Sequence, residues 1–209
     1  LDATKYFLLR ELPVSQDGLF TPEGFVERFN VDLCNDLGNL VNRTVGMMNK
    51  YYKGEVPKYN GHCNEPDESI EKFAIEQVKK FEEKMEDLEI ANALAEIWGL
   101  ISRTNKYIDE TAPWVLAKED NKEKLDAVMY HLVENLRIVA ILLKPFMQKT
   151  SESMLAQLGL TKPEFQTWES IAKYQTNLVD VKVIEQGKPL FVRLDKEEEI
   201  AYIKEQMAK

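Results

Sequence analysis

Residues 31–52, VDLCNDLGNLVNRTVGMMNKYY, place apolar side chains at the spacing of a helix. When successive residues are set 100° apart, one arc of this helix is apolar and the opposite arc is polar. The apolar arc holds Leu33, Cys34, Leu37, Leu40, Val41, Val45 and Met48. The pattern predicts an amphipathic helix that buries one face against a core. It also predicts that the thiol of Cys34 is buried.

The same period recurs along most of the chain. It predicts helices over residues 69–88, 89–108 and 121–143, and a short helix near 151–158. Pro145 is expected to end or kink the third of these helices, because proline cannot continue a helical hydrogen-bond ladder. Most of the sequence is therefore predicted to be helical.

Local signals set the helix boundaries. The Thr-Pro pair at 21–22 is typical of a helix start, with Gly54 at the far end and a possible interruption near Asn30. Either Asp67 or Ser69 is expected to cap the following helix. Pro13 is expected to stop a short first helix and open a turn-rich loop.

The period changes near the C-terminus. Apolar residues alternate at Val181, Val183, Leu190 and Val192, which predicts an extended segment or a loose hairpin. A charged helix closes the chain. The predicted fold class is all-α: a helical bundle of four or five main helices, with a short extended segment and a helix near the C-terminus.

Composition narrows the classes of function. The chain has 209 residues, 44% of them hydrophobic, and no apolar run long enough to span a membrane. Its formal charge of −9 argues against DNA binding or any affinity gained by neutralising many phosphates. Unpaired bases remain possible partners, because stacking and edge hydrogen bonds need few cations. Two cysteines suit a reducing, cytoplasmic compartment.

The usual catalytic and metal-binding motifs are missing. The sequence contains no glycine-rich phosphate loop, no G-x-S-x-G and no H-E-x-x-H. His62 and Cys63 are adjacent, but no second pair completes four metal ligands, so no metal site is predicted. His131 is expected at the surface or boundary of its helix. The sequence therefore predicts no active site within this chain.

The polar arc of the 31–52 helix carries the first candidate binding residues. Asn39 and Arg43 are four residues apart and are therefore neighbours on the helix surface, with Asn42 beside them. An asparagine amide donates and accepts at once, which suits a base edge, and a guanidinium can grip or stack on a base. Gly46 on the same face would allow close approach. A merely polar, solvated face explains the same residues.

The stretch DETAPWVLAK, residues 109–118, carries the second candidate. A helical pattern stops there, Pro113 fixes the direction of the chain, and Trp114 follows at once. Trp114 is either a core residue near a helix end or an exposed platform for stacking. Trp98 lies on a core stripe, and Trp168 fits a small satellite cluster. Asn105 lies on a mostly buried face and is expected to bond backbone near a turn.

Four stretches of the chain resemble one known family. They are DATKYFLLRELPVSQDGLFTPEGFVERFNVDLCNDLGNLVNRT, NKYIDETAPWVLAK, NLRIVAILLKPFMQKTSESMLAQLGL and GKPLFVRLD. Together they are similar to the C-terminal part of the bacterial methionyl-tRNA synthetases, which are class I aminoacyl-tRNA synthetases. The resemblance implies an α-helical anticodon-binding domain. It implies that Asn39, Arg43 and Trp114 meet the anticodon bases, supported by Pro113, Asn42 and Asn105.

The resemblance also implies a division of the chain and a set of partners. Residues 1–20 would be the stub of the junction to a catalytic domain, residues 21–175 the bundle, and residues 176–209 a piece that packs back toward the junction. The catalytic domain of the family, with its HIGH and KMSKS signatures, is not in this sequence, and residue 1 falls just after the second of these. The fragment is therefore expected to be inactive alone. The expected partners are methionine tRNA and the catalytic domain, with ATP and magnesium serving the parent enzyme.

Two alternatives remain at this point. The stretch DLGNLVNRT is also similar to the sister synthetases for leucine, isoleucine, valine or cysteine. A non-enzymatic helical scaffold, with Trp114 packed inside, would explain the same helical pattern. The Pro-Trp corner together with the Asn–Arg pair favours the methionine family.

Overall fold

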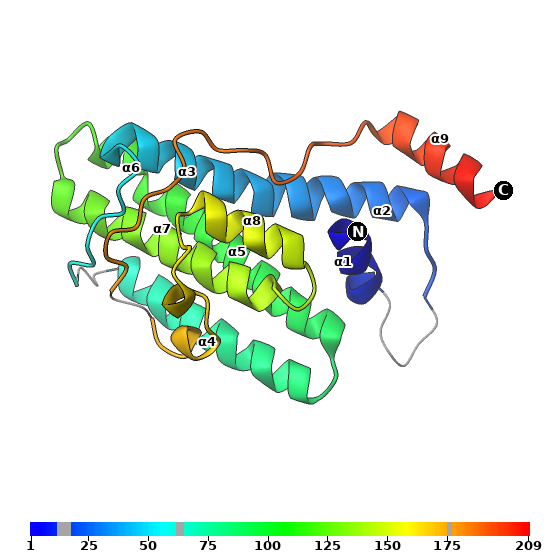
Figure 1. Ribbon diagram of the computed structural model, residues 1–209, viewed down its shortest axis with the longest axis horizontal. Helices are drawn as coiled ribbons and strands as arrows, with labels where there is room; N and C mark the ends of the chain where they lie inside the picture. Colours follow the sequence, from blue (N-terminus) through cyan, green and yellow to red (C-terminus); the bar gives the residue numbers. More distant parts are fainter. Residues whose placement is uncertain (12–17, 62–64, 175–176) are drawn as a thin grey trace.

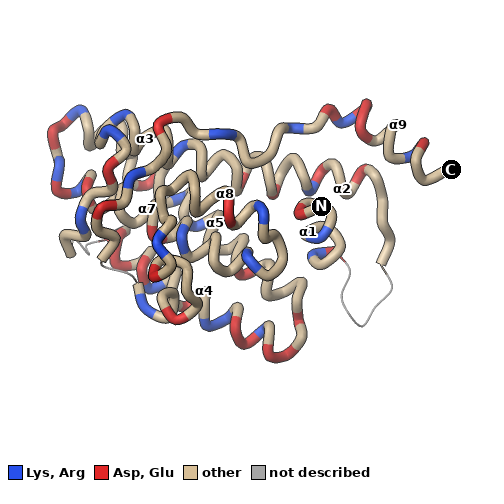
Figure 2. Tube along the Cα trace, in the orientation of Figure 1, with Lys and Arg blue, Asp and Glu red and all other residues tan. Residues whose placement is uncertain are grey.

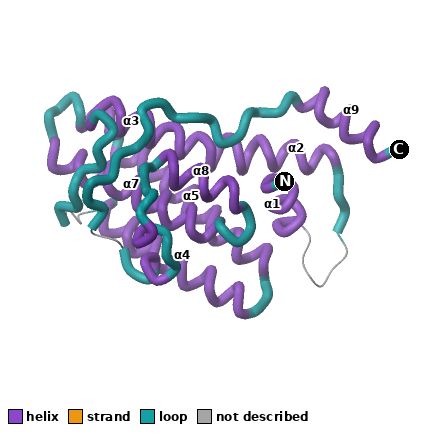
Figure 3. Tube along the Cα trace, viewed as in Figure 1, coloured by secondary structure: helices purple, strands orange, loops and turns teal. Residues whose placement is uncertain are grey.

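A computed structural model describes residues 1–11, 18–61, 65–174 and 177–209. This part of the chain is helical and contains no strand (Figures 1 and 3), which confirms the all-α prediction. The helices are α1 (Asp2–Glu11), α2 (Pro22–Arg28), a π-helical segment (Phe29–Gly38), α3 (Asn39–Tyr52), α4 (Asp67–Glu86), α5 (Ile90–Thr111), α6 (Pro113–Leu116), α7 (Lys122–Leu143), α8 (Gln148–Gln157) and α9 (Lys196–Met207). Two 3₁₀ turns cover Pro163–Phe165 and Glu169–Ile171. The predictions for the loop after Pro13 and for His62 and Cys63 fall outside the described residues.

The first long helix is one rod made of α2, the π-helical segment and α3. The Thr21 hydroxyl accepts a hydrogen bond from Gly24 N at 3.1 Å, and Pro22 is the first helical residue, as predicted. The predicted break near Asn30 does not occur, because the backbone changes to π-helical spacing and continues. The rod ends where Lys53 and Gly54 both adopt positive φ, of 54° and 86°.

The π-helical segment explains why Cys34 is not where the sequence puts it. A π-helix bonds residue i to i+5, so each residue turns the chain by less than the 100° of an α-helix. Residues 29–38 therefore drift away from the predicted arcs. Cys34 leaves the apolar arc and is only half-buried, so the prediction of a buried thiol is wrong.

Helix α7 is the centre of the bundle. Every residue from Ala127 to Leu143 is buried, because α3, α4, α5, α6 and α8 all pack against this helix. His131 is therefore fully buried, and the prediction that it lies at a helix surface or boundary is wrong. Its Nε2 lies 2.6 Å from Glu71 Oε1, and its Nδ1 lies 2.5 Å from the Ala127 carbonyl. Helix α7 ends at Leu143, just before Pro145, as predicted.

The start of α4 also differs from the prediction. The N-cap position is Pro66, which makes no side-chain cap bond, so neither Asp67 nor Ser69 is the cap. Asp67 instead accepts a hydrogen bond from the Tyr107 hydroxyl at 2.5 Å, and the Ser69 hydroxyl lies 2.9 Å from Arg103 Nη2. Both side chains thus tie α4 to α5.

The short N-terminal helix α1 shares the core of the bundle. Tyr6 stacks on Trp98 with ring centroids 4.2 Å apart, which places Trp98 in the core as predicted. The Asp2 carboxylate accepts from Thr150 N at 2.8 Å and so binds the first turn of α8. Trp168 is partly exposed and packs against Phe81, with ring centroids 5.8 Å apart.

Residues 177–195, which we call the strap, run as an extended segment beside the rod before α9 packs against α2 (Figure 1). The extended segment is as predicted, but the hairpin is not formed. The one β-bridge among the described residues joins Glu55 to Lys182. Side chains of the rod hold the strap elsewhere: Asn49 donates to Ile184 O at 2.8 Å, and Asn30 exchanges two bonds with the Leu194 backbone. The division at residues 20 and 175 stays a prediction.

In the described part of the chain, every helix is too short or too polar to cross a bilayer.

Candidate nucleic-acid interface

Helix α5 lies along the rod, and three contacts set their register. Trp98 Nε1 lies 3.4 Å from Asp32 O, Asn105 Nδ2 donates to Asp36 O at 3.3 Å, and Arg43 Nη2 lies 3.3 Å from Asp109 Oδ1. Residue numbers rise together on both elements, so the two run in the same direction. The C-terminal end of α5, and the corner that follows it, therefore lies at the flank of α3.

The corner is built from Ala112 and Pro113. Ala112 has φ 44° and ψ 64°, which is left-handed backbone that costs an alanine roughly 1–2 kcal/mol. A residue before proline normally prefers an extended conformation, so the sequence signal correctly marks the corner but not its geometry. Pro113 is buried, and Val115 N donates to Ala112 O at 2.8 Å, which holds the strained turn in place.

Trp114 projects from this corner into solvent. Trp114 is 41% exposed and Val115 is 39% exposed, whereas Leu116 is buried. Among the described residues, the Trp114 indole makes no hydrogen bond and no ring contact. The scaffold alternative, which has Trp114 packed inside, therefore does not fit. An exposed indole on a rigid corner can stack on a flat ligand.

Among the asparagines of the rod and Asn105 of α5, Asn35 accepts a hydrogen bond from Arg193, and the others fall into two groups. Asn30, Asn49 and Asn105 use their amides on backbone groups of the chain itself. Asn39 and Asn42 are exposed, and their amides bond no other described residue. Only the second pair can offer both a donor and an acceptor to a partner without breaking the fold.

Arg43 lies one turn beyond Asn39. Its side chain is 32% exposed and pairs with Asp109, which is 68% exposed. A pair this exposed contributes little to stability, and the remaining guanidinium donors stay available. The next turn carries Gly46, where an added Cβ would meet no heavy atom within 4 Å. The backbone of α3 is therefore open beside Arg43.

Asn105 behaves as expected from the sequence, with one difference. Its amide donates to backbone carbonyls, those of Asp36 and Ile101, both at 3.3 Å. These acceptors belong to the π-helical segment and to α5 itself, not to a turn. Asn105 therefore uses both of its N–H groups to position the two helices.

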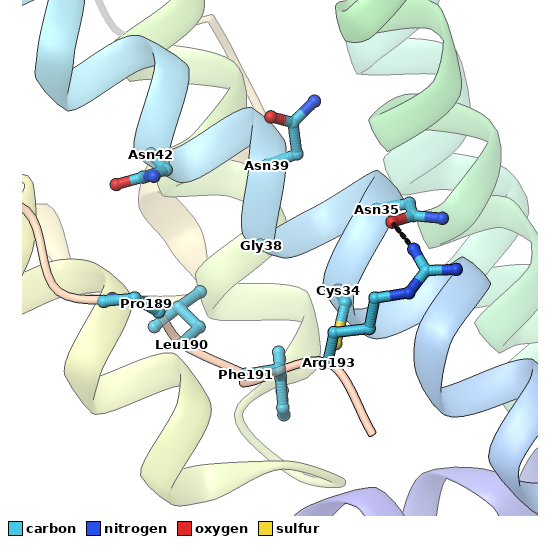
Figure 4. A pocket seen from close by; sticks show the side chains of 9 residues that line it. All are labelled: Cys34, Asn35, Gly38, Asn39, Asn42, Pro189, Leu190, Phe191 and Arg193. Carbon is cyan, nitrogen blue, oxygen red and sulfur yellow. Dashed lines mark hydrogen bonds between the residues drawn. The ribbon is translucent and has the colours of Figure 1, made fainter. Parts of the chain in front are cut away.

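A hollow of about 500 Å³ lies on the other flank of α3, between the rod and the strap (Figure 4). It is lined by Cys34, Asn35, Gly38, Asn39, Asn42, Pro189, Leu190, Phe191 and Arg193. Burial raises the pKa of the Cys34 thiol, and the charge of Arg193 opposes that rise. Both basic and acidic residues lie along the strap (Figure 2).

Sequence reasoning missed some of these residues. Asp109 lies inside the quoted corner stretch, five residues before Trp114, and its acidic side chain is a signal that could have suggested a partner for Arg43. Asn35 and Arg193 are 158 residues apart and carry no joint signal in the sequence. Burial and the neighbouring Asp32 raise the pKa of Asp36, whose backbone carbonyl accepts from Asn105.

Comparison with known proteins gives a consistent result. The family described as the anticodon binding domain of methionyl tRNA ligase matches residues 56–208, and that of class I (M) tRNA synthetases matches residues 1–45. The methionine–tRNA ligase of Bacillus subtilis (strain 168) is 57% identical over 208 residues, covering 99% of this chain and 31% of the relative. That of Listeria monocytogenes serovar 1/2a is 51% identical over the same share.

Comparison with solved structures points to the same family. The apo form of Mycobacterium tuberculosis methionyl-tRNA synthetase superposes with a TM-score of 0.83 at 29% identity, covering 93% of this chain and 39% of that one. The complex of the same enzyme with methionyl-adenylate gives 0.82. The chain spans about a third of the length of the curated relatives it matches. By sequence and by fold, this chain belongs to the methionyl-tRNA synthetase family, as its anticodon-binding domain.

Proposed function

We propose that this domain reads the CAU anticodon of methionine tRNA, so that the parent enzyme attaches methionine to the correct tRNA in protein synthesis. The observation that carries the proposal is the pair of uncommitted amides, Asn39 and Asn42, beside Arg43 on the open side of α3. The exposed indole of Trp114 lies on the corner that borders the same helix.

Each side chain suits a different part of an unpaired base. Asn39 offers a donor and an acceptor to a Watson–Crick edge, and Arg43 adds a planar set of donors. Trp114 presents an aromatic face on which a base can stack, a contact that needs no positive charge. This mode of recognition is compatible with a chain of net charge −9.

We further propose that ATP and magnesium act in the catalytic part of the parent enzyme, in the cytoplasm, and that this domain alone does not form methionyl-adenylate. The class I (M) match over residues 1–45 supports a junction to that part. The measurement is methionine-dependent exchange of pyrophosphate into ATP. Exchange by the 209-residue chain alone would contradict this division of labour.

The central test is Trp114→Ala, with binding measured to a stem-loop RNA that carries a CAU loop. Loss of base stacking is expected to cost roughly 1–3 kcal/mol, a 5- to 150-fold weaker Kd. Trp168→Ala is the matched control, because Trp168 is 38% exposed but lies against Phe81 and Glu82. It should leave the affinity unchanged.

Base specificity needs a second comparison. Stem-loops with altered anticodon bases should bind the wild-type domain more weakly, and Asn39→Ala should narrow that difference. Equal affinity for all loops, or an unchanged affinity in Trp114→Ala, would contradict the proposed function.

A further inference from the structure

The charge of the hollow beside the strap is unlike that of the chain as a whole. Its lining includes three asparagines and one arginine but no carboxylate, although the chain carries a net charge of −9. Its volume of about 500 Å³ lies within the range of roughly 300–1,000 Å³ that is typical of small-molecule sites. The hollow can therefore receive a group that is flat, polar and negatively charged.

Arg193 is the source of that positive charge. Its Nη1 donates to Asn35 Oδ1 at 3.2 Å, as the dashed line in Figure 4 shows. Among the described residues, no carboxylate oxygen lies within 4.0 Å of this guanidinium. Four other arginines do have a carboxylate partner: Arg28, Arg43, Arg103 and Arg137. The charge of Arg193 is thus held in place but not neutralised.

The wall that carries Arg193 is fixed to the rod. The Asn30 amide bonds the Leu194 backbone on both its N–H and its C=O, at 2.9 and 3.0 Å. Further along the strap, Lys188 N donates to Gln157 Oε1 at 2.9 Å. A ligand therefore meets a prepared surface, and little conformational entropy is lost on binding.

The hollow is continuous with the proposed anticodon site through Asn39, which lines its rim. Asn42 projects from α3 next to Gly187 of the strap, and the apolar side chains of Pro189 and Leu190 lie on the strap side of the hollow (Figure 4). The rod side of the hollow carries amides and the strap side carries apolar groups. A base matches this arrangement, because its edges are polar and its faces are apolar.

We infer that this hollow binds one unpaired nucleotide of the anticodon loop, on the opposite flank of α3 from Trp114, with Arg193 at its phosphate and Asn42 at its base edge. The inference rests on the proposed function and adds a second nucleotide subsite to it.

The first test uses Cys34, which lines the hollow, as a reporter of its occupancy. In a Cys63→Ser background, the rate of alkylation by iodoacetamide is measured at fixed pH with and without the CAU stem-loop. At an RNA concentration of roughly 100 times Kd, about 1% of the hollow is free, so the rate should fall by at least tenfold.

The tryptophan emission that RNA quenches in the wild type but not in Trp114→Phe reports on Trp114, and this signal separates the two possible failures. Quenching of the indole with no protection of Cys34 would overturn the subsite and leave the proposed function intact. If the RNA changes neither signal, the proposed function itself fails, and the subsite fails with it.

The second test separates the charge of Arg193 from its hydrogen bond. Arg193→Gln keeps a donor for Asn35 but removes the charge, so the slope of log K against log salt should become shallower by about 0.7, the value for one phosphate of a single strand. Arg193→Lys should keep the slope. An unchanged slope in Arg193→Gln would overturn the inference.

Lys196→Ala is the matched control, since it removes the same charge three residues further along, where the lysine pairs with Glu27 on α2 at 3.5 Å. Its slope should equal that of the wild type. An equal loss in Lys196→Ala would show a diffuse charge effect and would also overturn the subsite.

Discussion

Replacing Arg137 by methionine tests how α7 holds the two 3₁₀ turns, Pro163–Phe165 and Glu169–Ile171, in place. Arg137 and Glu134 are both fully buried on α7. Arg137 Nε and Nη2 bond the two oxygens of Glu134 at 2.7 and 2.8 Å. The same guanidinium donates to Phe165 O at 3.0 Å, and to the hydroxyl and carbonyl of Ser170 at 2.6 and 3.1 Å. One side chain thus connects α7 to both 3₁₀ turns.

The cost of Arg137→Met follows from this geometry. The buried carboxylate of Glu134 loses its counter-charge, and breaking such a pair on one side costs roughly 3–5 kcal/mol. For a domain of this size each kcal/mol lowers Tm by about 2–4 °C, so the expected fall is about 6–20 °C. Thermal unfolding followed by circular dichroism measures it.

Two further variants make the result decisive. Arg103→Met removes a partly exposed ion pair with Glu110 and the hydrogen bond to Ser69, and should cost about 2 kcal/mol or less. Adding Glu134→Leu to Arg137→Met removes the buried carboxylate and should recover a large part of the loss. A loss below about 1 kcal/mol in Arg137→Met, or a double variant no more stable than the single, would refute the electrostatic reasoning.

Three other variants test separate features. Burial and Asp32 raise the pKa of Asp36, so the stabilising contribution of this carboxyl is present below about pH 4 and is lost as pH rises through the raised pKa. Asp36→Asn should therefore raise Tm at pH 7 but not in acid. A gain in Tm that does not depend on pH would contradict this. Gly159 has φ 71°, and a Cβ added there would lie 1.9 Å from Lys182 O. Gly159→Ala should therefore displace the strap and lower the free energy of unfolding, measured in urea, by more than about 2 kcal/mol. An unchanged free energy of unfolding would argue against that contact. Gly46→Ala meets nothing within 4 Å and should gain about 0.5–1 kcal/mol in the same assay, which a loss would contradict.

Most of the helices could be predicted because their residues follow the period of the α-helix. The π-helical segment could not, since a change in backbone spacing leaves the residue types unaltered. The predicted burial of Cys34 is wrong for this reason. His131 was misjudged for another reason. An isolated helix pattern cannot show that α7 is enclosed on every side, so a polar residue in it was expected near solvent.

The candidate site was predictable in part. The polar arc with Asn39 and Arg43 follows from helical geometry, and the Pro-Trp corner follows from the effect of proline on the chain. The left-handed Ala112 that aims the corner does not follow from either. Contacts such as Arg43 with Asp109 and Asn35 with Arg193 join distant parts of the chain, and only the folded arrangement reveals them.

The hydrogen bonds between the rod and α5 have a consequence for how this domain tolerates insertions. Trp98–Asp32 and Asn105–Asp36 fix the spacing of α3 and the Pro113–Trp114 corner by direct contact, not by the length of chain that joins them. Extra residues at the tip between α4 and α5 would therefore lengthen the hairpin while Trp114 stayed in register with α3. Relatives can be expected to vary in size at that tip without moving the Trp114 corner relative to α3.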